Sequence, residues 1–182
     1  MEFREKMASE WYSKGAVAFR DDNIFESFIY LWIAWIIACK IYFSNNGHLT
    51  REQQQNITDS EVVQQWAKIN SSLIIESILK NKSSLNLLAN RKGTKFSNPI
   101  VDTGSKELRD DFHVFRAFVR DDFQIKDAKY IAVVFARLLN KIRNNLFHGG
   151  KAYSDEKDRE LLNAILPTLR EIVERETIRI TA

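Results

Sequence analysis

An arginine and a histidine stand five residues apart in the segment Lys141-Ile-Arg-Asn-Asn-Leu-Phe-His-Gly-Gly-Lys151. Arg143 is a permanent cation whose planar fork of donors matches the oxygens of a phosphate group. His148 is of the side-chain type that takes and gives protons near neutral pH. One group that moves protons and one that stabilises negative charge are the minimal parts for cleaving a phosphodiester through its own 2′-hydroxyl. Since RNA supplies that nucleophile, the pair predicts RNA cleavage without a metal ion.

Helix geometry sets a condition on this pair. An ideal helix turns about 100° per residue, so positions five apart differ by about 140° and do not share a face. The two side chains therefore converge only if the helix ends before His148, which Gly149-Gly150 favours, or if two chains bring their pairs together across an interface. Arg143 and His148 can also simply cap carbonyls at a helix end, and spacing alone favours that structural role.

Positive charge is concentrated around this segment. The chain has 27 basic and 24 acidic residues and a net charge of +3. Between Ala128 and Ser154, however, there are five basic residues and no acidic one. A concentrated positive field on a nearly neutral protein attracts anionic partners, whereas the alternative interpretation is a solvated, lysine-rich helix face. Because the motif lies inside this stretch, we expect Lys141 and Lys151 to contact the phosphates of RNA.

Few other residues have catalytic or metal-binding chemistry. Of the three histidines, His48, His113 and His148, none pairs with another at a metal-binding spacing on one helix, and His113 is expected to be structural. The single cysteine, Cys39, excludes an intramolecular disulfide framework and a multi-cysteine zinc site. It stands in an apolar run and is predicted to be a small buried hydrophobe. The sequence therefore predicts neither a metal site nor a cofactor.

The composition predicts an all-α protein, an up-and-down bundle of about five to six helices. The chain has only 6 glycines and 2 prolines, too few for the many turns of a sandwich or barrel. Its 45% hydrophobic residues exclude a disordered chain. A length of 182 residues suits one compact core, so we expect a single domain over residues 1–182.

Apolar spacing and helix-end signals divide the chain into six expected helices. A capping box at Thr58-Asp59-Ser60-Glu61 predicts one helix start, and Gly149-Gly150 predicts a helix end. Pro167 predicts a kink within residues 163–166 of the last helix. The expected helices cover residues 3–20, 23–44, 58–80, 105–121, 127–147 and 154 onward, with an internal loop at 89–104.

The second of these helices is apolar almost all round. Its longest apolar run, Phe28 to Cys39, has 12 residues and ends at Lys40, short of the roughly 20 that a bilayer-spanning helix needs. Such a helix belongs at the centre of a bundle or in a subunit interface, so we expect a symmetric homodimer. The charged opening Met1-Glu-Phe-Arg-Glu-Lys shows no signal peptide. We therefore expect a cytoplasmic protein without a membrane partner.

The segment Arg143-Asn144-Asn145-Leu146-Phe147-His148, an R-x4-H motif followed by two glycines, resembles the signature of HEPN domains. These domains are small helical bundles common in prokaryotic toxin–antitoxin, phage-defence and CRISPR systems. Residues 25–34 resemble, more weakly, the early core helix of that family. Members are typically metal-independent endoribonucleases that act as dimers, with both motifs facing one cleft.

This resemblance implies a role for each residue of the motif. Arg143 would hold the scissile phosphate, His148 would take or donate a proton, and Asn144 would orient the pair. Some toxins of the family have, two residues after the histidine, a tyrosine that a partner nucleotidyltransferase modifies, but this position is Gly150 here. The alternative is a non-catalytic HEPN-like module that binds RNA or a partner protein such as an antitoxin or a nucleotidyltransferase.

Overall fold

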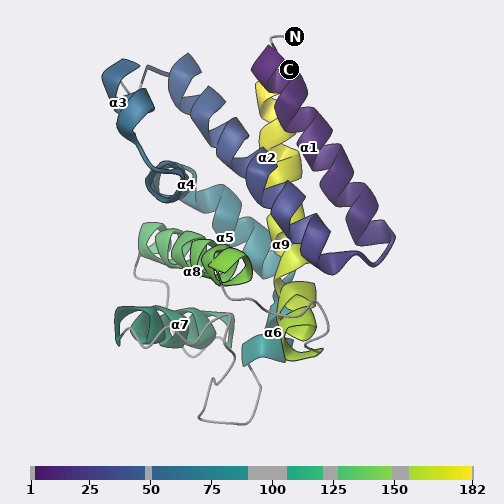
Figure 1. Ribbon diagram of the computed structural model, residues 1–182. Helices are drawn as coiled ribbons and strands as arrows, with labels where there is room; N and C mark the ends of the chain where they lie inside the picture. Colours follow the sequence, from purple (N-terminus) through teal and green to yellow (C-terminus); the bar gives the residue numbers. More distant parts are fainter. Residues whose placement is uncertain (1–2, 48–50, 90–105, 121–126, 149–155, 182) are drawn as a thin grey trace. The chain divides into compact units, whose positions relative to one another are not determined.

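The structure is a computed structural model, described here for residues 3–47, 51–89, 106–120, 127–148 and 156–181 (Figure 1). Within these ranges the chain forms helices and no strand, so the predicted all-α class is confirmed. The helices are α1 (Phe3–Arg20), α2 (Ile24–Asn45), α3 (Arg51–Asn56), α4 (Asp59–Ile69), α5 (Ser71–Lys80), α6 (Lys82–Ala89), α7 (Lys106–Val119), α8 (Ala128–His148) and α9 (Glu156–Thr181).

Most expected helices are confirmed with ends within two residues, but the helix expected over 58–80 is two helices, α4 and α5. Asn70 separates them with non-helical backbone angles, φ −100° and ψ 35°. Asparagine and the two serines after it offer the backbone local hydrogen bonds that compete with those of a helix. The capping box is confirmed, because the Thr58 N–H donates to Glu61 Oε2 at 2.9 Å and the Glu61 N–H donates to Thr58 Oγ1 at 3.2 Å.

Two short helices, α3 and α6, were not expected. They have 6 and 8 residues, too few to show an apolar period in the sequence. The expected loop at 89–104 begins at the last residue of α6, and its remainder lies outside the described residues.

Chain contacts divide the protein into two compact units. Unit 1 comprises residues 1–66 and 169–182, and unit 2 comprises residues 67–168. One boundary falls within α9, just after Pro167, so the kink expected there stays a prediction, as does the single-domain organisation.

Within unit 1, α1 and α2 form an antiparallel pair joined by a short turn (Figure 1). Ser27 Oγ donates a hydrogen bond to the Gly15 carbonyl at 2.9 Å across this pair. A Cβ atom added at Gly15 would stand 2.8 Å from Leu31 Cγ and 3.2 Å from the Leu31 backbone nitrogen. The two backbones thus approach so closely that only glycine fits at position 15. This explains why α1 contains a glycine, a residue that otherwise weakens a helix.

The core of unit 1 is aromatic. Trp35 is fully buried, and its ring meets those of Trp32 and Trp66 edge to face, with centroids 5.7 Å apart in each pair. Edge-to-face contacts of this kind align the positive edge of one ring with the negative face of the other. Helices α2 and α4 are joined through these rings.

Helix α2 has the length and apolar composition of a membrane-spanning helix, and it is the one such helix in the described part of the chain. The most apolar window of α2, which is 18 residues long, has a mean hydropathy of 1.7. The 12-residue apolar run found in the sequence therefore understated the apolar length of this helix. However, 67% of that window is buried inside the molecule. Such burial is typical of the core helix of a soluble protein.

Within unit 2, α7 lies against α8 (Figure 1). Asp111 pairs with Arg137, and the ring of Phe115 stacks on that of Phe135 with centroids 5.6 Å apart. Because the later residue on α7 meets the earlier residue on α8, the two helices run antiparallel. Helix α8 carries Lys141, Arg143, Asn144 and His148, four of the five residues to which the sequence assigned chemistry.

Candidate functional site

The basic residues of α8 lie on two different rows of the helix. Ala132, Ala136 and Leu139 are fully buried at i, i+4, i+7 spacing, and Arg143 occupies the next position of that row. Arg143 itself is half-buried. Its side chain therefore begins beside the core of unit 2 and not on the solvent face of the helix.

The structure brings Arg143 and Asn144 together. Arg143 Nη1 donates a hydrogen bond to Asn144 Oδ1 at 2.9 Å, and the bond is partly buried. Asn144 belongs to the polar row, so this bond draws the guanidinium from the buried row toward the polar one. An acceptor on one edge of the planar fork restricts its rotation. The role expected for Asn144, to orient the pair of Arg143 and His148, stays a prediction.

Arg137 and Lys141 occupy the polar row with Asn144, at i, i+4, i+7 spacing. Arg137 Nη2 donates to Asp111 Oδ1 at 2.6 Å, and this carboxylate is 2% exposed. Its charge is therefore committed to a buried ion pair between helices. Lys141 is half-buried, and α8 carries no acidic residue.

His148 is the last residue of α8, and its side chain lies outside the described residues. The condition that the helix ends before His148 is therefore not met within the chain. By helix geometry, its backbone position continues the row of Arg137, Lys141 and Asn144, about 140° around the axis from Arg143. That a second chain brings an arginine and a histidine side chain together stays a prediction. Lys151 lies outside the described residues.

A buried polar cluster in unit 1 was not predicted. Glu176 on α9 is fully buried, and its Oε1 accepts hydrogen bonds from Trp66 Nε1 at 3.1 Å and Arg179 Nη2 at 2.6 Å. Burial raises the pKa of the Glu176 carboxyl, and Arg179 and Trp66 partly offset this. Cys39 is buried as predicted, and burial, followed by the Glu176 charge, raises the pKa of its thiol. The signal in the sequence was a glutamate four residues after Ile172 on an apolar face.

Because the pKa of the Glu176 carboxyl is raised, we expect the protein to lose stability as pH rises. Because its pKa is higher in the folded than in the unfolded state, the folded state binds the proton more tightly between the two values. The free energy of unfolding should therefore fall as pH increases through that window. Glu176→Gln keeps a carbonyl acceptor for Trp66 and should remove this part of the pH dependence, as measured by urea unfolding from about pH 4 to about pH 7.

The matched control is Glu26→Gln, which changes an exposed glutamate on α2. It should leave the pH dependence of the free energy of unfolding as in the wild type. Parallel stability curves for the wild type and Glu176→Gln would contradict the expected role of Glu176.

His113 is exposed on α7 and takes no part in the buried core of unit 2, so its expected structural role stays a prediction. The described residues hold no group of three or more histidine, cysteine or acidic side chains that could hold a metal ion.

The chemistry that the sequence assigned to this region thus has a partial geometric basis. Arg143 and Asn144 are joined by a hydrogen bond, Lys141 lies in the row of Asn144 on α8, and His148 is placed by its backbone alone. Comparison with protein-family models, with curated proteins and with solved structures finds no match to this chain.

Proposed function

We propose that this protein is a metal-independent endoribonuclease that cleaves RNA through the 2′-hydroxyl and leaves cyclic phosphate ends. The observation that carries the proposal is the 2.9 Å hydrogen bond from Arg143 to Asn144 near the end of α8. It orients a permanent cation on a helix that has four basic residues and no acidic one. A preoriented cation that stabilises developing negative charge is among the strongest contributions a protein makes to such a reaction.

In the proposed reaction, the 2′-oxygen forms a bond to phosphorus and the bond to the 5′-oxygen breaks. A proton leaves the 2′-hydroxyl and another reaches the departing 5′-oxygen, so the reaction needs groups that accept and donate protons. His148 performs this transfer, and Arg143 stabilises the charge on the phosphate. Asn144 positions Arg143, while Lys141 and Lys151 contact neighbouring phosphates.

We further propose that two copies of the chain assemble the site. Arg143 and His148 are about 140° apart around α8, so a second copy is the route that brings an arginine and a histidine to one phosphate. A homodimeric nuclease of this type fits a cytoplasmic toxin or phage-defence effector that an antitoxin or nucleotidyltransferase holds in check.

One observation favours a second candidate function. Since α8 continues through His148, a single chain does not bring the pair together, and the same surface then suits a non-catalytic module that binds RNA or a partner protein. Binding of RNA without cleavage distinguishes this module from the nuclease.

The proposal predicts cleavage of mixed cellular RNA by the purified protein in EDTA. The wild type should produce fragments with cyclic phosphate ends, whereas Arg143→Ala/His148→Ala should produce none, because the variant lacks both the cation and the proton carrier. Gel analysis and end-group chemistry measure the result.

The control variant is Arg4→Ala, which removes an exposed arginine on α1 and should cleave as the wild type does. Cleavage by the double variant would remove the assignment of these residues. Intact RNA that is bound by a folded wild type would favour the binding module.

A further inference from the structure

A second basic surface lies on α7, outside the segment that the sequence singled out. His113, Arg116 and Arg120 stand at i, i+3, i+7 spacing, which places them in one row about 10 Å long. Arg120 follows the last residue of α7, and its N–H donates to the Arg116 carbonyl at 3.0 Å, so the helical turn continues to it. His113 and Arg120 are exposed, and Arg116 is half-buried.

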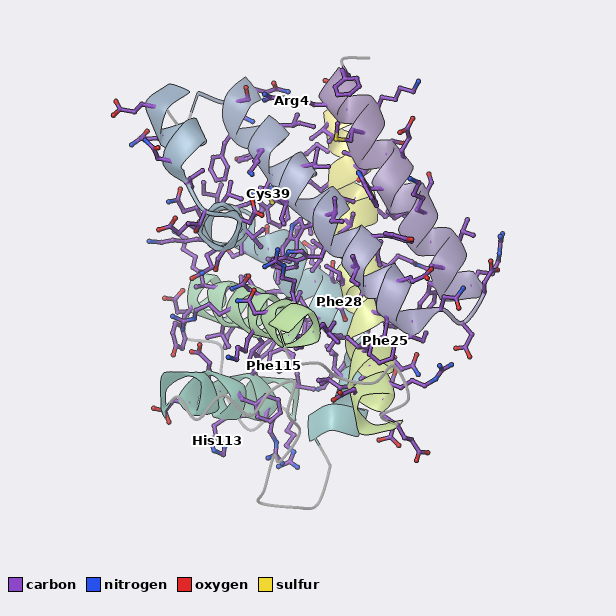
Figure 2. All side chains as sticks on the ribbon, in the orientation of Figure 1. Arg4, Phe25, Phe28, Cys39, His113 and Phe115 are labelled. Carbon is purple, nitrogen blue, oxygen red and sulfur yellow. The ribbon has the colours of Figure 1, made fainter. Side chains whose placement is uncertain are left out.

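Most of the apolar side chains described on α7, and the carboxylate of Asp111, lie on the side of the helix away from this row. The apolar face of α7 is buried in unit 2 through Phe112, Phe115, Phe118 and Val119. Figure 2 shows His113 pointing away from α8, on the opposite side of α7 from that face. Of the acidic residues described on α7, Asp111 is turned inward to Arg137, and exposed Asp110 lies one turn before His113, away from the arginines.

The two arginines of the row are close enough to influence each other. Burial, followed by the charge of Arg120, lowers the pKa of the Arg116 guanidinium. The Arg116 guanidinium lies 5.8 Å from the centre of the Phe112 ring, which supports it along the helix surface. An anion placed at this row would therefore interact with two positive charges at once.

We propose that His113, Arg116 and Arg120 bind the phosphate backbone of single-stranded RNA. The inference rests on the proposed function in naming RNA as the ligand. Guanidinium forks match phosphate oxygens, and a row along a helix suits a chain of repeated negative charges. Among residues 110–120, where the structure describes the side chains, no exposed residue is a large hydrophobe. A protein partner or a lipid surface would need such a group at its centre, whereas a phosphate backbone does not.

The test measures binding without cleavage. The probe is a fluorescein-labelled, single-stranded 2′-O-methyl oligonucleotide, which lacks the nucleophile that the proposed reaction needs. Arg116→Gln/Arg120→Gln should weaken its binding about tenfold at low salt in fluorescence anisotropy. Because two phosphate contacts are lost, the slope of log K against log salt should become shallower by about 1.4.

The control is Arg4→Gln/Lys68→Gln, which removes the same two positive charges at exposed positions outside the row and should bind within about twofold of the wild type. Arg120→Gln alone, at an exposed position, should reproduce about half of the change in slope if the double variant folds poorly.

The proposal would be overturned if the control variant lost as much binding as the double variant, if the double variant bound like the wild type, or if the wild type did not bind at all. It would also be overturned if the row bound poly-glutamate but not the oligonucleotide, because that result would assign the row to an acidic protein partner. Binding through the row by a protein that cuts no RNA would uphold this inference and refute the proposed function alone. Cleavage that is accompanied by unchanged binding in the double variant would do the reverse.

Discussion

Replacing Arg143 with lysine is expected to lower the rate of RNA cleavage by about 10²–10³-fold while the protein stays folded. Lysine keeps the positive charge but has no planar fork, so it loses both the bidentate match to phosphate and the hydrogen bond to Asn144 Oδ1. Asn144→Ala should give a smaller loss, because the fork remains and only its orientation is relaxed. Single-turnover cleavage of a labelled RNA in EDTA measures both rates.

Arg20→Lys provides the matched control for this series, because Arg20 is an exposed arginine on α1 whose neighbour is Asp21. Its cleavage rate should equal that of the wild type. If Arg143→Lys also cleaved at the wild-type rate, only the charge at this position would act, and the positioning role of Asn144 would be lost.

The second large effect concerns the aromatic core of unit 1. Trp35→Ala should lower the free energy of unfolding by about 3–5 kcal/mol, because it removes a fully buried ring and leaves a cavity beside Trp32 and Trp66. Urea unfolding followed by far-ultraviolet circular dichroism measures the change, since tryptophan fluorescence is itself altered by the substitution.

Trp11→Ala is the corresponding control. Trp11 is half-buried on α1, where its ring lies 5.5 Å from that of Tyr30 and Lys14 stands over it. Its removal should cost less than half as much as the removal of Trp35, since less area is returned to water. Equal losses would show that the three core rings do not stabilise unit 1 as their burial indicates.

The parts of the fold that were predictable are those encoded within a few residues. The capping box at Thr58 fixes the start of α4 through contacts with near neighbours, and α8 ends at His148, just before the glycine pair that predicted a helix end. Asn70 was missed because asparagine occurs both within helices and at their ends. The apolar spacing that predicted one helix continues past Asn70 and so does not record the break.

The candidate site was predictable to the same extent. Arg143 and Asn144 are adjacent in sequence, so their contact follows from local geometry. Arg137 binds a carboxylate 26 residues away, and no spacing rule revealed that its charge is committed. The basic row on α7 was missed because a charge count along the sequence sets its arginines against acids such as Asp111, whose carboxylate is turned inward to Arg137.

The division of the chain also bears on how the protein is made. Unit 1 needs residues 169–182, whereas unit 2 is one continuous piece that ends at residue 168. Since folding begins while the ribosome is still adding residues, unit 2 can be completed first although α1 and α2 emerge earlier. Until Glu176 has been synthesised, the indole N–H of Trp66 lacks the carboxylate that accepts it, 110 residues later in the chain. The tryptophan core of unit 1 therefore stays incomplete until the last residues of α9 have been added.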